Sequence, residues 1–118
     1  MEFVERKIIF HGSHFVDFYL EQTTKVQEKI EFVFHIIKRV ERVSKKFLSP
    51  MENTDGLFEI RVEYGSNIYR IFCCFDEGRI VVLFNAFQKK TQKTPQKEIE
   101  KALRLKREYF ELKKTSRK

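Results

Sequence analysis

The chain has 118 residues, of which 42% are hydrophobic and 35% are charged, and its formal net charge is +7. This length predicts a single domain over residues 1–118, because a chain of this size can bury about two-thirds of its unfolded surface around one core. No apolar run approaches the roughly 18–20 residues needed to cross a bilayer, and neither end resembles a signal peptide. We therefore expect a cytoplasmic protein without membrane contact.

The excess positive charge lies in the second half of the chain. Residues 1–56 contain nine Lys or Arg and nine Asp or Glu, whereas residues 57–118 contain fifteen and eight. A positive field over one part of a protein favours an anionic partner such as nucleic acid. The alternative is a solvated surface that only aids solubility, and charge alone does not separate the two.

The cysteine and histidine residues predict neither a metal site nor a cofactor. Cys73 and Cys74 are adjacent on an expected strand, so their side chains point to opposite faces and cannot pair readily. No further cysteine or nearby histidine stands at zinc-ligand spacing. We expect two buried, reduced thiols. His11, His14 and His35 are scattered through the first half and are expected to be structural or exposed.

The first half predicts a strand followed by two helices. Val4–Phe10 is a strand candidate, and Ser13 can cap a first helix. Thr24 and Gln27 fit a capping box for a second helix, which is expected to end near Lys45. The apolar residues of this second helix follow a three-four spacing: Val26, Ile30, Val33, Ile37 and Val40. The two helices should form an antiparallel hairpin.

After a loop over residues 47–55, the stretch from Gly56 to Pro95 predicts three antiparallel strands. Gly65-Ser66 suits a two-residue turn between the first two strands, which places Arg61 opposite Arg70. A second turn at Glu77-Gly78 would place Asn85 beside Arg70. Arg61, Arg70 and Asn85 are therefore expected to form one row across three strands.

One face of this sheet should be entirely apolar. With the turns above, it would carry Phe58, Ile60, Val62, Tyr64, Tyr69, Ile71, Cys73, Phe75, Ile80, Val82, Phe84 and Ala86. A face without charge has to be covered, and the amphipathic helix hairpin is the available cover.

The opposite face should carry the arginines. Its other expected residues are Leu57, Glu59, Glu63, Phe72, Val81, Leu83, Asn85 and Phe87. Two arginines side by side repel each other, at a cost of up to about 1 kcal/mol. Either Glu59 and Glu63 neutralise them in a surface ladder of ion pairs, or the arginines are held together to bind a phosphate. The pairing leaves both interpretations open.

A lysine-rich segment follows the third strand and leads into a final helix. Thr94 as N-cap and Pro95 in the first turn predict the helix start, and the helix is expected to reach about Leu112. Lys89, Lys90 and Lys93 precede the positive end of its dipole, which predicts an anion-binding site.

These segments resemble the RelE/ParE superfamily of bacterial toxins, and most closely its phage-derived, HigB-like branch. The matching pieces are GLFEIRV (Gly56–Val62), NIYRIF (Asn67–Phe72) and FQKKTQKTPQKEIEKAL (Phe87–Leu103), and the helical first half is compatible with them in order and length. The resemblance implies an α+β, RelE-like fold with a mostly antiparallel four-stranded sheet, the N-terminal helix hairpin on one face, and a C-terminal helix.

The resemblance also implies an activity, a type II toxin–antitoxin system and partners. Members pair with a cognate antitoxin encoded nearby, often in higher-order complexes. Many are mRNA interferases, which cleave messenger RNA in the 30S A site of the ribosome without a metal. This endoribonuclease activity would arrest translation and growth. The alternatives are a ParE-like, non-enzymatic inhibitor of DNA gyrase and a basic RNA-binding module without catalysis.

Site residues are carried over by position. Arg70 matches the arginine that contacts the scissile phosphate. Lys90 matches a basic residue that stabilises the charge of the same phosphate, and Lys89 is its neighbour. Arg61 matches the arginine of the EIRV-like strand. Several relatives have a histidine near the position of Asn85, whereas this chain has no histidine in its second half. Further candidates for RNA binding are Lys93, Asn85, Phe87, Glu59 and Lys97.

These residue types suit cleavage by the RNA's own 2′-hydroxyl, which attacks the adjacent phosphate. Arginine and lysine would stabilise the phosphoryl oxygens. A lysine with a lowered pKa could remove the 2′-hydroxyl proton, with Lys89 and Lys93 as candidates and Glu59 as a weaker one. Phe87 could stack on a base or belong to the core.

Overall fold

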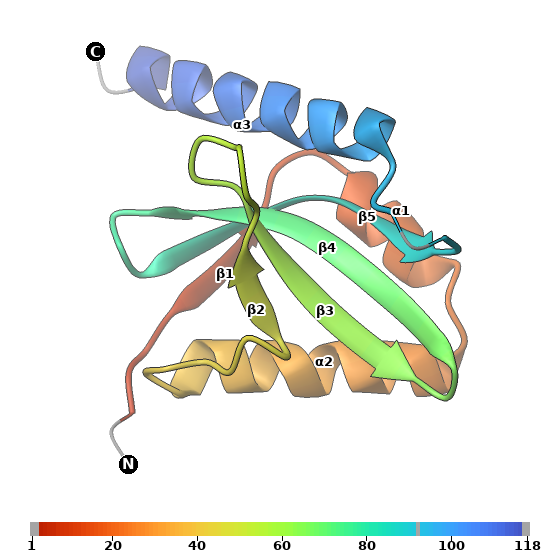
Figure 1. Ribbon diagram of the computed structural model, residues 1–118. Coiled ribbons are helices and arrows are strands. Elements are labelled where there is room, and N and C mark those ends of the chain that lie inside the picture. Colours follow the sequence, from red (N-terminus) through yellow and green to blue (C-terminus); the bar gives the residue numbers. More distant parts are fainter. Residues whose placement is uncertain (1–2, 92, 117–118) are drawn as a thin grey trace.

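The computed structural model describes residues 3–91 and 93–116. It has an α+β architecture, in which one sheet lies between helices on both of its sides (Figure 1). The elements are β1 (Lys7–Phe10), α1 (His14–Leu20), α2 (Thr24–Arg39), β2 (Leu48–Pro50), β3 (Phe58–Tyr64), β4 (Asn67–Asp76), β5 (Ile80–Lys89) and α3 (Gln96–Ser116).

The sheet has five strands in the order β1-β5-β4-β3-β2, and it is mixed because β1 runs parallel to β5. The expectation of four strands is corrected by β2, which lies within the segment expected to be a loop. Its three residues are too few to show a periodic pattern, and it ends on Pro50. Proline is tolerated there because β2 is an edge strand.

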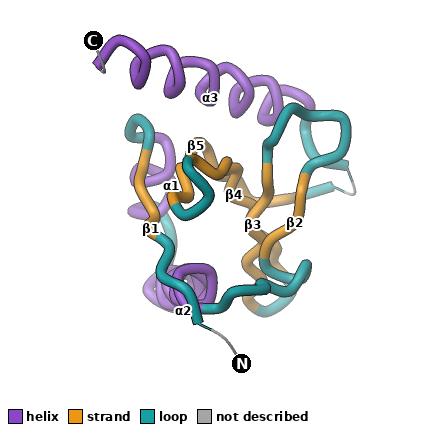
Figure 2. The backbone as a smooth tube through the Cα atoms, turned by 90° about the vertical axis from the view of Figure 1, so that its left-hand side faces the viewer, coloured by secondary structure: helices purple, strands orange, loops and turns teal. Residues whose placement is uncertain are grey.

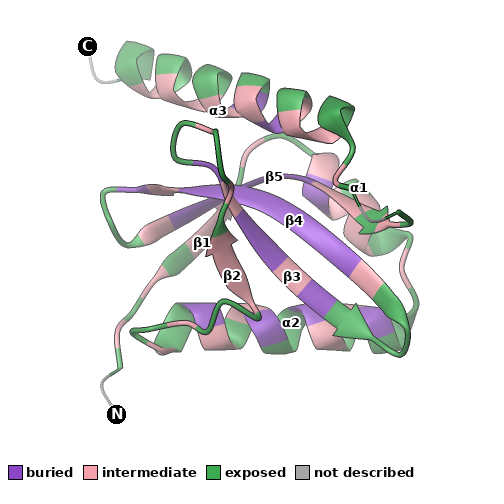
Figure 3. Cartoon of the chain, viewed as in Figure 1, coloured by how far each residue is buried: buried purple, intermediate pink, exposed green. Residues whose placement is uncertain are grey.

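The helices form layers on the two sides of the sheet. Figure 2 shows α2 below the strands and α3 above them. The first core, between the sheet and the α1–α2 hairpin, contains Phe15, Val26, Ile30, Val33, Ile37, Ile60, Val62, Tyr69, Ile71, Cys73, Val81 and Leu83. The second core, under α3, contains Leu57, Phe72, Cys74, Val82, Phe84, Ala102 and Leu105. The central strand β4 is consequently buried over most of its length (Figure 3).

The register between β3 and β4 is confirmed. Tyr64 pairs with Asn67 across the two-residue turn, and Arg61 lies directly opposite Arg70. The turn chemistry of Gly65 accounts for this, since its positive φ of 61° fits a tight hairpin turn.

The expected register between β4 and β5 is wrong. Asp76 pairs with Ile80, so the turn has three residues, and Glu77 and Gly78 both adopt positive φ. A β-bulge then shifts the pairing again opposite Phe72, and Arg70 pairs with Phe87 instead of Asn85.

The new register also exchanges the faces of β5. Val81 and Leu83 belong to the first core, whereas Val82 and Phe84 belong to the second and Ile80 packs against it. After the bulge, Ala86 again packs against the first core, as the sequence predicted. The face expected to be open is therefore partly covered by α3.

The ends of the helices differ from expectation by small steps. Thr23 is the N-cap of α2 and its side chain accepts a hydrogen bond from Val26 N, so the cap lies one residue before Thr24. Ser13 precedes α1 but makes no capping hydrogen bond through its side chain. α3 begins one residue after Pro95 and continues to Ser116, beyond the expected end near Leu112.

α2 ends at Arg39, six residues before Lys45, because its last carbonyl groups are taken by Arg6 and Val4. The guanidinium group donates from Nη1 to Ile37 O at 2.9 Å and to Val40 O at 2.6 Å, and from Nη2 to the next carbonyl at 2.6 Å. Val40 itself is extended. The last two carbonyls of the helix accept from the backbone, Lys38 O from Arg6 N and Arg39 O from Val4 N, both at 2.9 Å. The segment before β1 thus satisfies the carbonyls that any helix end leaves unpaired.

Both cysteines lie where the sequence placed them. Cys73 faces the first core and Cys74 the second, and both are free and buried. Burial raises the pKa of both thiols, that of Cys74 to about 11, where Lys106 partly offsets the effect and Asp76 adds to it. Thiols held in the protonated form are poor nucleophiles.

We predict that Arg6→Ala lowers the free energy of unfolding by about 1.5–3 kcal/mol, because the substitution removes three charge-assisted hydrogen bonds, one to the last turn of α2 and two to the residues directly after it. Urea denaturation monitored by circular dichroism measures the change. Arg42→Ala removes an exposed cation from the same region and is the control, with an expected change within about 0.5 kcal/mol. Equal stability of the two variants would contradict the capping role.

Candidate functional site

The site forms where β3, β4 and β5 run side by side on the face that carries α3. Residues paired in register point to the same face, so Arg61, Arg70 and Phe87 form one row. Ile68 pairs with Lys89 in the neighbouring row. Lys89 therefore lies diagonally next to Arg70, whereas Phe87 takes the place directly beside Arg70 that the sequence assigned to Asn85. We call Arg61, Arg70, Lys89 and Lys90 the basic cluster.

Arg70 is the most deeply buried residue of this cluster. Only 8% of it is exposed, and its Nη1 donates to Glu59 Oε2, a carboxylate that is buried as well. Arg61 is half-buried, and its Nη2 lies 2.6 Å from Glu63 Oε1. The ladder of ion pairs considered from the sequence is therefore present. It neutralises the repulsion between the two arginines and leaves Lys89 and Lys90 without a carboxylate of their own among the described residues.

The two guanidinium groups still have unused donors. Nε of Arg61 and Nε of Arg70 are both buried and have no hydrogen-bond partner in the described part of the chain. An unsatisfied buried donor costs about 1–3 kcal/mol, so such groups are rare unless they serve a purpose. An incoming anion is the kind of acceptor that would satisfy them.

Lys89 has the electrostatic setting of a proton acceptor. Partial burial lowers its pKa, and the positive charges of Arg70 and Arg61 lower it further, while Glu59 acts in the opposite direction. A lower pKa increases the fraction of neutral amine near pH 7, and only the neutral amine can accept a proton.

The remaining basic candidates are at the surface. Lys90 and Lys93 are exposed in the segment between β5 and α3, and Lys97 is exposed in the first turn of α3. Lys89 and Lys90 line a hollow of about 360 Å³ together with Ile68 and Thr91, which we call the strand-end hollow. It opens beside the basic cluster, because Ile68 lies two residues before Arg70 on the same face.

Asn85 has a structural role that the sequence did not predict. Because the bulge turns it towards α3, its Nδ2 donates to Glu98 O at 3.0 Å and to Glu98 Oε1 at 2.9 Å. Asn85 is fully buried and is not part of the arginine row. Its assignment to RNA binding is therefore corrected: it fixes the beginning of α3 over the sheet.

Phe87 packs into the second core, because its ring lies 5.6 Å from that of Phe72 between ring centroids. The core role considered from the sequence is thus observed. The half-buried ring also lies directly across from Arg70, at the border between the core and the basic cluster.

The histidines lie away from the basic cluster, but His11 is not without a partner. Its Nε2 lies 2.7 Å from Glu108 Oε1 on α3, and its ring contacts those of Phe84 and Tyr109. The far end of α3 is held by Asp76, which accepts hydrogen bonds from Tyr109 and Lys113 at 2.7 Å.

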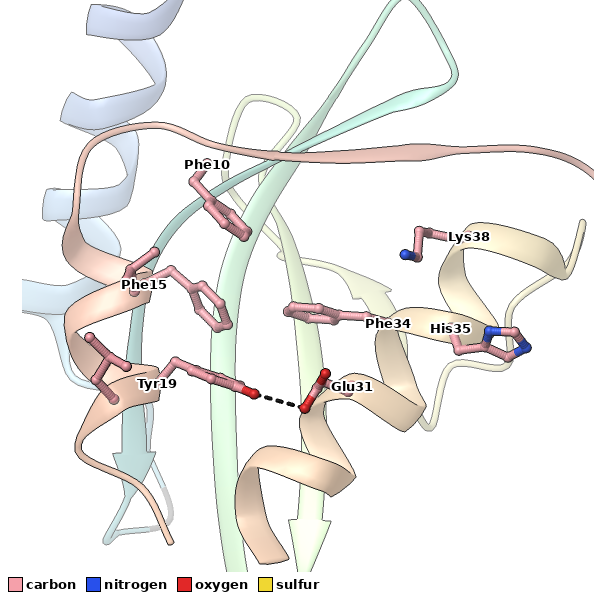
Figure 4. Close-up of a pocket in the computed structure, with 9 residues that line it drawn as sticks. Phe10, Phe15, Tyr19, Glu31, Phe34, His35 and Lys38 are labelled. Atoms are coloured by element: carbon pink, nitrogen blue, oxygen red, sulfur yellow. Dashed lines mark hydrogen bonds between the residues drawn. The ribbon is translucent and has the colours of Figure 1, made fainter. Parts of the chain in front are cut away.

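An apolar groove lies on the opposite side of the molecule, between α1 and α2 and below β1 (Figure 4). It has a volume of about 520 Å³ and is lined by aromatic rings, among them Phe10, Phe15 and Phe34. Tyr19 closes one side by donating a hydrogen bond to Glu31. The groove shares no residue with the basic cluster.

Two first-half lysines were missed by sequence reasoning. Lys29 of α2 and Lys46 of the loop before β2 line a hollow of about 200 Å³ at the open edge of β3, which we call the edge hollow. Its other lining residues are Phe47, Arg61, Glu63 and Gly65. The way in which α2 crosses the sheet brings Lys29 beside Arg61, and the hydrogen bond from Arg61 N to Phe47 O brings Lys46 there. No local pattern in the sequence signals either arrangement.

We predict that Glu59→Ala lowers the free energy of unfolding by about 3–5 kcal/mol, because the substitution leaves the buried charge of Arg70 uncompensated. Glu63→Ala breaks the half-exposed pair with Arg61 and should cost no more than about 1 kcal/mol. Urea denaturation of both variants gives the comparison. A cost for Glu59→Ala as small as that for Glu63→Ala would contradict the buried pair.

Comparison with known families gives the chain an identity. No helix in the described part of the chain is long and apolar enough to cross a membrane. A comparison with curated proteins finds no match. The family model of the phage derived protein Gp49-like (DUF891) matches residues 17–107, which include the second half of α1, all of α2, the strands β2 to β5 and the first half of α3. The chain therefore belongs to the Gp49-like family of phage-derived proteins, a family of RelE/ParE-like toxins.

Proposed function

We propose that this protein is the toxin of a type II toxin–antitoxin system, of the HigB-like branch, and that it cleaves messenger RNA in the ribosomal A site. Its partners would be a cognate antitoxin encoded nearby and the translating ribosome. The observation that carries the proposal is the basic cluster, in which Arg61 and Arg70 lie side by side and Lys89, with its lowered pKa, adjoins them.

The proposed reaction is internal transesterification. The 2′-oxygen attacks the adjacent phosphorus, the bond to the 5′-oxygen breaks, and the products are a 2′,3′-cyclic phosphate and a 5′-hydroxyl. One proton leaves the 2′-hydroxyl, and one is taken up by the departing 5′-oxygen. Negative charge grows on the phosphoryl oxygens during the attack. A well-placed donor to that charge contributes about 2.7–4 kcal/mol.

Each residue of the cluster has a proposed role that fits its position. Arg61 and Lys90 reach the surface and would bind the phosphoryl oxygens first. Arg70 lies beneath them and would stabilise the transition-state charge, held in orientation by Glu59. Lys89, as the neutral amine, would accept the 2′-hydroxyl proton.

The flanking residues complete the proposal. Phe87 would offer its free edge to a base beside Arg70, and Lys93 and Lys97 would attract the RNA backbone. A substrate positioned by the ribosome would compensate for modest proton-transfer groups, because orientation alone can supply several kcal/mol.

We predict that Arg70→Lys and Arg61→Gln each reduce mRNA cleavage by about 10²–10³-fold, because each removes a donor to the phosphate. Arg70→Lys keeps a cation beside Glu59, so the fold is preserved better than with Arg70→Ala. Inducible expression, with and without the neighbouring open reading frame, and mapping of mRNA 5′ ends measure the reduction. Lys45→Gln removes an exposed cation outside the cluster and should leave cleavage and growth arrest unchanged.

The same experiment separates the alternatives. Cuts within translated codons, suppressed by the neighbouring gene product, support the proposal. Growth arrest with intact mRNA and inhibited DNA gyrase would replace it by a ParE-like mechanism, and no arrest at all would leave a basic RNA-binding module. Full toxicity of folded Arg70→Lys and Arg61→Gln variants would refute the role of the cluster.

We predict that the rate of cleavage on purified ribosomes rises with pH and levels off above the pKa of Lys89, since the neutral amine is the active form. Lys89→Arg keeps the charge but cannot deprotonate, so it should be slow and should not show this rise. Lys90→Arg keeps both charge and profile and is the control. An unchanged pH profile in Lys89→Arg would exclude Lys89 as the base.

A further inference from the structure

The edge hollow has the charge and size of an anion site. Its three cations come from three separate parts of the chain, Lys29 from α2, Lys46 from the loop before β2, and Arg61 from β3. The hollow contains one carboxylate, Glu63, which is paired with Arg61. At about 200 Å³, it admits a phosphate group but not a helix or a folded segment.

The two lysines are held ready for such a ligand. Lys29 Nζ lies 4.8 Å from the centroid of the Phe32 ring, and Lys46 Nζ lies 5.7 Å from that of Phe47. Within residues 3–91 and 93–116, neither ammonium group forms an ion pair. The rings orient the amines without neutralising them, so both charges remain free to bind an anion.

The edge hollow continues the basic cluster across the sheet. Arg61 belongs to both, and Glu63 of the hollow pairs with Ile68, which in turn pairs with Lys89. The strand-end hollow at β5 and the edge hollow at β3 thus lie on either side of β4, separated by two strand spacings or about 10 Å. Arg70 on β4 lies between them.

We propose that the edge hollow binds the phosphate of a nucleotide next to the one that is cleaved, so that the RNA strand crosses the sheet from β5 to β3. This inference rests on the proposed function and adds Lys29 and Lys46 as positioning residues for the substrate. Phosphate contacts set register without reading sequence, so the contribution should be the same for every RNA sequence.

The test measures RNA binding by the full chain, separately from cleavage. The probe is a fluorescein-labelled single-stranded RNA of twelve nucleotides whose ribose groups are all 2′-O-methylated, so it cannot be cleaved. Fluorescence anisotropy at several salt concentrations gives the affinity and its salt dependence. Lys29→Gln/Lys46→Gln is compared with Lys25→Gln/Lys45→Gln, which removes the same charge from the same helix and the same loop outside the hollow.

The expected result is a several-fold decrease in affinity for Lys29→Gln/Lys46→Gln, uniform across RNA sequences. The slope of log K against log salt should become less steep by about 0.7 for each phosphate that the variant no longer neutralises. Lys25→Gln/Lys45→Gln should keep both the affinity and the slope to a much greater extent.

Equal effects of the two double variants would overturn the inference, because they would reflect the general field of the protein. No effect of either, or no binding of the probe by the wild-type chain at low salt, would overturn it as well. If the variants behave as expected but cells show no mRNA cleavage, the subsite stands and the proposed function fails. If cleavage depends on Arg70 while probe binding ignores Lys29 and Lys46, only this inference fails.

Discussion

The extra residue of β5 opposite Phe72 forms a β-bulge, and this bulge determines which residues of β5 point to each face of the sheet. Before this bulge, alternate residues of β5 fill the first core and the second core in turn, and at the bulge Phe84 and Asn85 both turn to α3. After it, Phe87 and Lys89 rejoin the face of Arg70. Without the bulge, Lys89 would point to the helix hairpin, and the basic cluster would lose Lys89 although Arg61 and Arg70 would still lie side by side.

The boundary of the second core explains the unusual burial of Arg70. On one side of Arg70, Phe72 and Phe87 are the last apolar residues of the second core. On its other side, Lys90 is exposed to solvent. A guanidinium group in this position requires a carboxylate, which Glu59 supplies from the neighbouring strand. Stability and the proposed chemistry thus rely on the same ion pair, because the carboxylate that stabilises the buried arginine also limits how it can turn towards a ligand.

The sequence predicted the parts of the fold that depend on local chemistry. Gly65-Ser66 set the β3–β4 register, and with it the meeting of Arg61 and Arg70. The β4–β5 register could not be predicted, because Glu77 adopts a left-handed conformation that non-glycine residues rarely show, and a bulge leaves no periodic signal. The end of α2 could not be predicted for another reason: Arg6 is remote in sequence. The same holds for Lys29, which only the tertiary fold brings to the sheet edge.

The two attachments of α3 have a consequence for the lysine-rich segment before it. Asn85 holds the start of the helix, and Asp76 holds its far end, so both ends of the segment between Lys89 and Gln96 are fixed to one framework. A tethered segment of six residues has a short reach. Its lysines are therefore confined near the sheet at a high effective concentration. The entropy cost of bringing these cations together is met when the protein folds, so less of it remains to be met when an anion binds.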